Sequence, residues 1–136
     1  MDILIEKTQG GVPVTILGLK GDLDASNFQE VIKKVNDIFS LGGCDLLLDL
    51  SQLKFLSSSG IVALHSIALI MRGDRPHDLD NFWGTWHAIR EDKSSGKQEH
   101  VKLLNPAPKI QETLHKTGMD AFFEIFHDWN TALASF

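Results

Sequence analysis

The chain has 136 residues, 43% of them hydrophobic, and its 18 acidic and 13 basic side chains give a net charge of -5. This length and apolar content are enough for one domain with a packed core, but not for two. The negative charge argues against a surface that neutralises nucleic-acid phosphates or anionic lipid headgroups. We therefore expect neither nucleic-acid binding nor membrane insertion, and we expect the partners to be proteins.

The sequence predicts a cytoplasmic location. No apolar run reaches the roughly 18 residues that a membrane-spanning helix needs, and the stretch before Gly11 lacks the basic and apolar segments of a signal peptide. The single cysteine, Cys44, cannot form an internal disulfide, and it stands at the start of an apolar run. We expect it to be a small core residue in a reducing compartment.

A hairpin opens the chain. Ile3 to Glu6 and Val12 to Leu19 are apolar, β-branched runs separated by Gly10-Gly11. A glycine pair tolerates the positive φ angles of a tight turn, so the two runs are predicted to be antiparallel neighbours.

The next segment combines a helix and a strand. Apolar residues at spacings of three and four predict an amphipathic helix over 27–39, with Ser26 or Asn27 as its N-cap and Glu30 near the N3 position. Gly42-Gly43 is expected to end it. Cys44 to Leu50 is too short for another helix and reads as a strand covered on both faces.

A buried helix and a polar excursion follow. Ile61 to Met71 is apolar almost all round, which predicts a largely buried helix with His65 as a core histidine. Residues from about 74 to 98 are polar and charged, and they are expected to form an insertion with one short helix near Asp80 to Arg90.

Regular elements resume with a strand at Val101 to Leu104 and a helix from Pro106 or Pro108 to Thr117-Gly118. Phe122 to Phe126 reads as a last strand, and Asp128 to Leu133 as a closing helix. An opening hairpin followed by alternating strands and helices predicts an α/β fold, with a mixed, mostly parallel sheet of four to five strands and helices packed on it. Sites in such folds form at the carboxyl ends of the strands.

The stretch FLSSSGI, residues 55–61, places three hydroxyls before the buried helix. Ser57 or Ser58 could cap this helix and leave the rest a solvated turn. A nucleophilic serine is disfavoured because the elbow of serine hydrolases needs G-x-S-x-G, which is absent here. A hydroxyl in the first helical turn can instead accept a phosphate, since free N–H groups and the helix dipole favour negative charge there. We expect no enzymatic activity.

The histidines, the cysteine and two aspartates are the other residues whose side chains could carry chemistry. The six histidines form no HExxH pair, and one cysteine gives no zinc cluster, so we expect no metal and no cofactor. Asp22 and Asp24 lie between a predicted strand and a predicted helix, where one of them is expected to cap or charge the helix start.

An aromatic cluster lies in the excursion and consists of Phe82, Trp83 and Trp86. Phe82 and Trp86 would share one helical face. The cluster either packs the excursion onto its own domain or forms a second interface for a partner or for another copy of the chain.

Several short motifs, taken in order, resemble the STAS domain family, which includes the bacterial anti-sigma-factor antagonists. They are Gly21 to Ala25 after the second strand, Asp49 to Ser51 at the end of the third, and Phe55 to Ile61 opening a helix. Downstream, Val101 to Asn105 and Leu114 to Met119 resemble the family's later strand and its L-x-x-T-G turn. The resemblance covers the chain except for the excursion.

The resemblance implies a single STAS domain over 1–136, with an insertion at about 74–98. It implies a regulator that binds an anti-sigma factor of the serine-kinase type, is released when phosphorylated, and is restored by a phosphatase. The family's acceptor, the hydroxyl before the glycine, falls on Ser59, with Ser58 as second choice. The expected partner-binding residues are Asp22, Asp24, Ser57, Ser58, Ser59 and Gly60.

Family members usually carry an aspartate where this chain has Ser57, so a negative charge beside the acceptor is missing. Two other functions therefore stay open. One is a non-phosphorylated accessory subunit of a lipid-transport ABC system, and the other is a scaffold subunit of a stress-signalling complex. A homodimer is compatible with each of these functions.

Overall fold

The structure is a computed structural model that describes residues 1–9, 12–74 and 97–136. Its centre is a six-stranded sheet. The strands are β1 (Asp2–Gln9), β2 (Pro13–Leu23), β3 (Leu46–Asp49), β4 (Leu53–Leu56), β5 (Val101–Leu104) and β6 (Ile125–Phe126). The described helices are α1 (Phe28–Ser40), α2 (Ser58–Met71), α4 (Pro108–Lys116), α5 (Met119–Phe122) and α6 (Trp129–Ala134).

The sheet is mixed and mostly parallel, as predicted. β1 and β2 form the antiparallel hairpin, and β2, β3, β5 and β6 follow as parallel neighbours. The sheet has six strands rather than four to five, because β4 pairs in parallel with the far end of β2. The burial of β4 runs buried, exposed, exposed, buried, so it lacks the alternation by which a strand is predicted.

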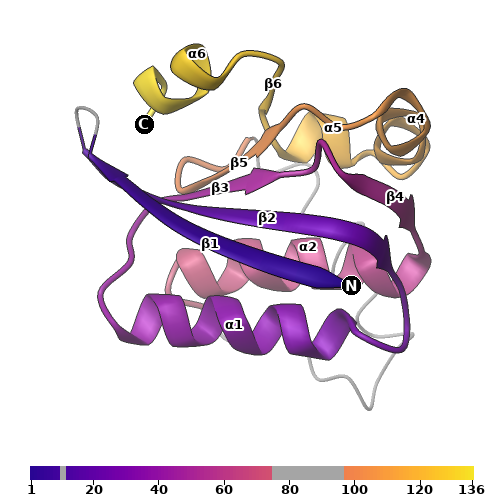
Figure 1. Cartoon of the computed structure of the whole chain (residues 1–136), viewed down its shortest axis with the longest axis horizontal. Helices are drawn as coiled ribbons and strands as arrows, with labels where there is room; N and C mark the ends of the chain where they lie inside the picture. Colours follow the sequence, from indigo (N-terminus) through magenta and orange to yellow (C-terminus); the bar gives the residue numbers. More distant parts are fainter. Residues whose placement is uncertain (10–11, 75–96) are drawn as a thin grey trace.

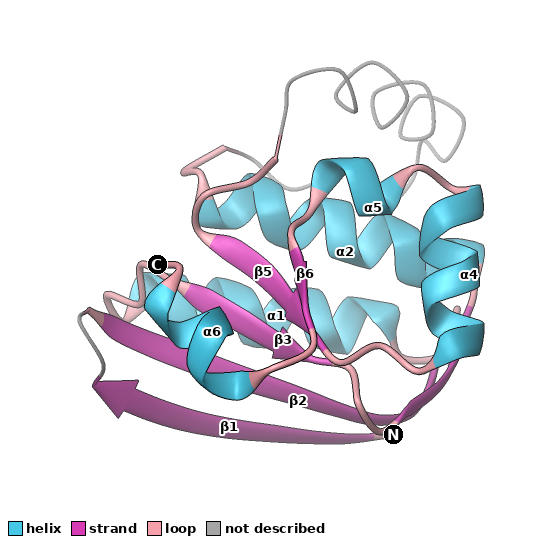
Figure 2. Cartoon of the chain, turned by 90° about the horizontal axis from the view of Figure 1, so that it is seen from above, coloured by secondary structure: helices cyan, strands magenta, loops and turns pink. Residues whose placement is uncertain are grey.

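Helices cover both faces of the sheet. Figures 1 and 2 show α1 and α2 side by side on one face and α6 on the other. The larger hydrophobic core lies between the sheet and the helices α1, α2, α4 and α5. Nearly all of α2 is buried, including His65, whose ring lies 5.0 Å from that of Phe122. The predicted buried helix and core histidine are confirmed.

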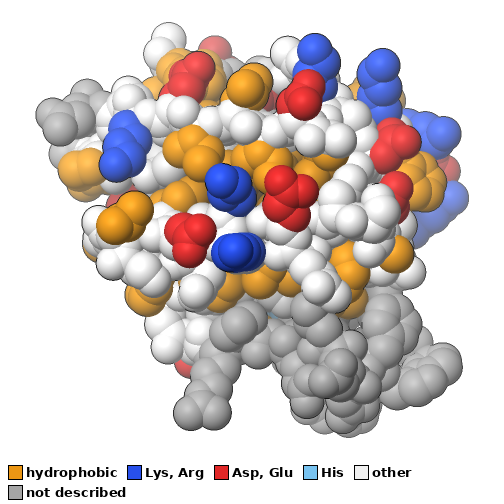
Figure 3. Space-filling view, turned by 60° about the horizontal axis from the view of Figure 1, so that its bottom comes forward, with side chains coloured by type: hydrophobic (Ala, Val, Ile, Leu, Met, Phe, Trp, Pro, Cys, Tyr) orange, Lys and Arg blue, Asp and Glu red, His pale blue; other side chains and the backbone are white. Residues whose placement is uncertain are grey.

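Helix α1 is amphipathic, as predicted. Val31 and Val35 are fully buried beneath the sheet. On the α1 side of the molecule, acidic and basic side chains alternate with small groups of apolar atoms (Figure 3). This mixture is typical of the solvent-facing side of such a helix.

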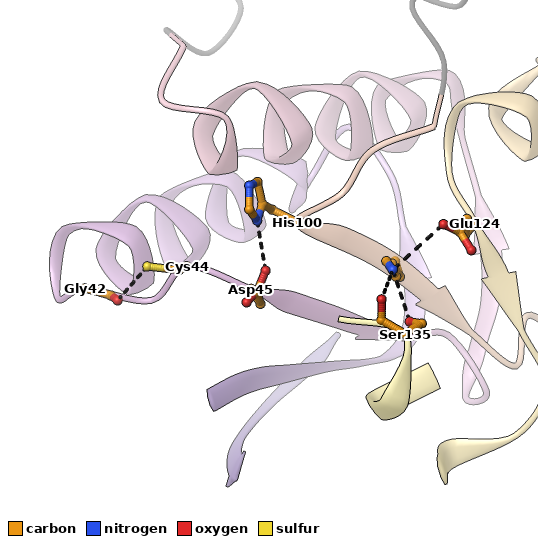
Figure 4. A network of polar contacts seen from close by, with 7 residues as sticks. Gly42, Cys44, Asp45, His100, Glu124 and Ser135 are labelled. Atoms are coloured by element: carbon orange, nitrogen blue, oxygen red, sulfur yellow. Dashed lines mark hydrogen bonds and ion pairs between the residues drawn. The ribbon is translucent and has the colours of Figure 1, made fainter. Parts of the chain in front are cut away.

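A smaller core lies under α6 and is linked to a buried lysine. Lys102, on β5, is 4% exposed, and its Nζ donates to the carbonyl oxygen and the hydroxyl of Ser135 at 2.8 and 3.1 Å. The Lys102 Nζ also lies 3.8 Å from a carboxylate oxygen of Glu124 and 4.8 Å from the centre of the Phe136 ring. Figure 4 shows the contacts with Ser135 and Glu124, which join the sheet to the end of the chain.

The prediction that Cys44 is a core residue is wrong. Its side chain is exposed, and the thiol lies 3.4 Å from the carbonyl oxygen of Gly42 (Figure 4). The reason is that β3 begins only at Leu46, so Cys44 belongs to the loop between α1 and β3. Gly42 has a φ of 96°, which confirms the glycine turn at this place.

The last predicted strand is shorter than expected. Phe122 closes the short helix α5, and only Ile125–Phe126 pairs with β5. Gly118 adopts a left-handed conformation with φ 78° and ends α4. The chain then makes one more helical turn, which buries Phe122 and Phe123 edge to face, with ring centres 4.8 Å apart.

Candidate functional site

Ser57 caps helix α2. Its backbone is extended, and its hydroxyl accepts a hydrogen bond from the N–H of Gly60 at 3.2 Å. The N–H of Ile61 donates to the Ser57 carbonyl at 3.0 Å and begins the regular helical pattern. Of the two serines predicted as caps, Ser57 is therefore the one that acts.

Ser58 and Ser59 occupy the first two positions of α2. Ser58 is exposed and Ser59 is half-buried. Within the part of the chain that the structure describes, neither hydroxyl makes a hydrogen bond. The backbone N–H groups of a first helical turn have no partner four residues earlier, so negative charge added here meets donors and the positive end of the dipole.

Gly60 is required for packing. A Cβ at this position would lie 2.5 Å from Leu56 Cδ1 and 3.0 Å from the carbonyl oxygen of Leu23. Real Cβ atoms essentially never come as close as the first distance, and the second contact is with backbone that cannot easily move. Gly60, expected from the resemblance to be a partner-binding residue, therefore has a role in packing α2 against the end of β2.

Strand β4 places the serines beside the Asp22 to Asn27 loop. The stretch FLSSSGI does not follow β3 directly, because β4 intervenes and ends with its first two residues, Phe55 and Leu56. The N–H of Ser57 donates to the carbonyl of Leu23 at 3.0 Å, where β2 ends. The serines and the aspartate loop therefore share one edge of the sheet, at the carboxyl ends of β2 and β4.

The aspartate loop is closed by its own side chains. Asn27 donates from Nδ2 to the carbonyl of Asp22 at 2.7 Å, and its Oδ1 accepts from the N–H of Asp24 at 3.0 Å. Asp24 Oδ1 accepts from the Ser26 hydroxyl and, at 2.9 Å, from the Ser26 N–H. These bonds, with the hydroxyl first, hold the pKa of Asp24 below 3.8. The loop thus presents a fixed negative charge.

Two details of this loop differ from the prediction. Asn27 stands at the N-cap position of α1, but its side chain makes no cap hydrogen bond, since both its polar atoms bind within the loop. Asp24 serves the helix through its carbonyl, which accepts from the N–H groups of Asn27 and Phe28, while its carboxylate closes the turn at Ser26.

Sequence reasoning missed one exposed residue at this edge. Phe55 lies in β4 opposite Asp22, two residues before Ser57, and 46% of it is exposed. It was missed because β4 itself was not predicted. The available signal was the three-residue spacing of Leu53 and Leu56, which leaves Phe55 outside the core.

The aromatic cluster Phe82, Trp83 and Trp86 and the predicted helix near Asp80 to Arg90 lie outside the described residues. Within 1–9, 12–74 and 97–136, no three histidine, cysteine, aspartate or glutamate side chains are placed to hold a metal ion. None of the described helices combines the length and the apolar composition needed to cross a membrane.

The model of the STAS domain family matches residues 4–72, which are 69 of the 136 residues. This matched part contains the aspartate loop and the serines. A search of curated protein sequences gave no match.

Solved structures share the fold. An anti-sigma factor antagonist from Mycobacterium paratuberculosis is similar with a TM-score of 0.68 and 19% identity, over 98% of this chain and 92% of that one. A proposed anti-sigma factor antagonist from Thermotoga maritima has a TM-score of 0.65 and 20% identity, over 89% of this chain and 85% of that one. The Bacillus cell fate determinant SpoIIAA in its phosphorylated form has a TM-score of 0.54 and 16% identity, over 98% of this chain and 97% of that one. At these identities the likeness establishes the fold.

Proposed function

Because this chain belongs to the STAS domain family, we propose that it is a protein-binding regulator of the anti-sigma-factor antagonist kind. The observation that carries the proposal is the display of Ser58 and Ser59 at the start of α2, beside the Asp22 to Asn27 loop. Its partner would be an anti-sigma factor that is also a serine kinase. The chain would act in the cytoplasm by binding, without a cofactor and without catalysis of its own.

The switch in this proposal is phosphorylation of a serine in the first turn of α2. A phosphate there adds about -1.5 to -2 charges, and the helix tolerates them because its N-terminal N–H groups favour an anion. The partner surface must instead cover a bulky dianion beside the carboxylates of Asp22 and Asp24. Each 1.4 kcal/mol of binding free energy lost in covering this dianion lowers the affinity about tenfold. A modest loss of binding free energy is therefore enough to release the partner.

The two candidate acceptors differ in accessibility. The resemblance points to Ser59, which is half-buried, whereas Ser58 at the first helical position is exposed. A kinase must bring its own catalytic groups to the hydroxyl, so exposure favours Ser58. The proposal includes both residues, and mapping of the phosphate assigns the role to one of them.

Ser57 favours a second candidate function. It keeps the helix cap by its hydroxyl but carries no charge, in contrast to the family's usual aspartate. A domain that keeps the fold of the site without this charge could bind constitutively, as an accessory subunit of a lipid-transport ABC system or as a scaffold in a stress-signalling complex. Such a protein would not be phosphorylated at the start of α2.

A phosphorylation assay separates these functions. The protein is incubated with ATP and with each anti-sigma-type serine kinase of the source organism, purified individually, and modified residues are mapped by mass spectrometry. We expect one kinase to place one phosphate on Ser58 or Ser59, and the matching alanine variant to abolish it. Ser51→Ala, an exposed serine outside α2, is the control. Phosphate found only elsewhere, or none with active kinases, contradicts the proposal.

A further inference from the structure

Phe55 is a large aromatic side chain left exposed beside the serines. It lies in β4, which pairs with the last residues of β2 and which Figure 1 shows next to the start of α2. Its neighbours Leu53 and Leu56 are 1% and 5% exposed, whereas Phe55 is 46% exposed. An isolated exposed aromatic residue is common, so its meaning depends on how the fold exposes it and on what surrounds it.

A β-bulge sets the direction of Phe55. In the ladder between β2 and β4, Gly21 pairs with Leu53, and the next residue, Asp22, pairs with Phe55. Lys54 is therefore the extra residue of the bulge. The bulge breaks the alternation of the strand, so that Leu53 and Leu56, three residues apart, are both buried and Phe55 is not. Bulges of this kind re-aim a side chain and are enriched next to functional sites.

The surroundings of Phe55 are polar and charged, with the exposed Lys54 directly before it and a carboxylate across the ladder. Asp22 stands opposite it in the ladder, and Asp22 is itself exposed. The hydrogen bond from Ser57 to Leu23 fixes the start of α2 against the same strand end. An apolar side chain set among charged side chains and hydroxyls has the composition of an interface centre, where an aromatic anchor is enclosed by polar contacts that exclude water.

We propose that Phe55 is the apolar anchor of the partner-binding surface, and that the anti-sigma-type kinase receives it in an apolar pocket with a basic rim. The basic rim follows from charge complementarity with Asp22 and Asp24, which lie on the same edge of the sheet. This inference rests on the proposed function, because it assigns a residue and a pocket chemistry to the same partner. It also explains release: a phosphate on Ser58 or Ser59 would have to be dehydrated beside the filled pocket.

The test compares Phe55 with Phe39. Phe39 is 39% exposed and lies near the C-terminal end of α1. It is roughly 16 Å along the helix axis from Phe28, where α1 begins after the Asp22 to Asn27 loop. Phe55→Ala and Phe39→Ala therefore remove the same side chain from two surfaces of similar exposure. Dissociation constants are measured by isothermal titration calorimetry with the kinase identified in the phosphorylation assay, using unphosphorylated protein without ATP.

We expect Phe55→Ala to raise Kd at least about 30-fold, as for an interface hot spot, and Phe39→Ala to change it less than about twofold. Phe55→Leu should recover most of the affinity, because the pocket is apolar. Thermal unfolding of both alanine variants should match the parent, since neither residue is in the core. For the basic rim, Asp22→Asn should slow association, and the association rate of the parent should fall with added salt.

The outcomes separate the two proposals. If the kinase binds the parent and Phe55→Ala equally well, the anchor is wrong and the proposed function stands. If none of the kinases binds the parent, the proposed function and the anchor fail together. If the parent self-associates in sedimentation experiments and Phe55→Ala is monomeric, the pocket belongs to a second copy of this chain and the inference is overturned. An association rate that does not depend on salt removes the basic rim.

Discussion

The hydroxyl of Ser57 has a structural role that can be separated from its missing charge. We expect Ser57→Ala to lose about 1 kcal/mol of unfolding free energy, because the N–H of Gly60 loses its acceptor. Ser57→Asp should be as stable as the parent, since an aspartate also caps a helix and suits the positive end of its dipole. Urea unfolding measures both. A Ser57→Ala variant as stable as the parent would show that the cap contributes nothing.

Gly60 lets α2 pack closely against Leu23 and Leu56. We expect Gly60→Ala to lose about 1 to 3 kcal/mol of unfolding free energy, because the new methyl group meets the Leu23 carbonyl as well as Leu56. Gly18→Ala is the matched control: its Cβ would meet only Leu4, at 3.6 Å or more. Chemical denaturation of the two variants compares them. A Gly60→Ala protein as stable as Gly18→Ala would mean that the helix can shift without cost.

Asp24 provides a pH-dependent part of the site. Its pKa is lowered in the folded state, so its bonds to Ser26 stabilise the loop above pH 3.8 and are lost as the pH falls through the lower folded pKa. An NMR titration of the carboxyl carbon should give a midpoint below 3.8, and Ser26→Ala should move that midpoint upward. If both proteins titrate at the same pH, the Ser26 hydroxyl does not hold the carboxylate.

Among the elements, α6 is held by few contacts. Ala132 is its only buried residue among those described, and Lys102 provides its main polar link through Ser135. We expect Lys102→Met to lose about 1 to 3 kcal/mol of unfolding free energy, because the apolar stem remains while two charge-assisted hydrogen bonds disappear.

Hydrogen exchange locates this effect. The amides of α6 should exchange faster in Lys102→Met, while those of α1 and α2 should keep their protection. Lys109→Met, which replaces an exposed lysine of α4, is the control and should leave exchange unchanged. Unaltered protection of α6 in Lys102→Met would show that apolar packing alone holds the element.

Element prediction succeeded where periodicity was strong and failed where it was absent. α1 and α2 were predicted because their apolar patterns are long and their ends carry glycines or serines. β4 was missed because a bulge cancels alternation in a strand of only four residues. The misplacement of Cys44 has a related cause, since adjoining apolar residues do not reveal where strand pairing begins.

At the scale of the whole molecule, the sequence predicted the order of the elements except β4 and α5, and it predicted the edge of the sheet where the site forms. The Asp22 to Asn27 loop and the serines are at least 30 residues apart in the chain, yet their closeness follows from the parallel arrangement of their strands. What could not be predicted is the detail that depends on tertiary contacts. The packing role of Gly60 and the outward direction of Phe55 are examples.

The central claim is that negative charge at the start of α2 decides whether the partner binds. The most direct measurement is the Kd of the kinase for the parent protein before and after quantitative phosphorylation at Ser58 or Ser59, with ATP removed and the modified residue verified by mass spectrometry. The account predicts at least about a tenfold weaker complex after phosphorylation, with unchanged thermal unfolding. A phosphorylated protein that binds as tightly as the unmodified one would contradict it.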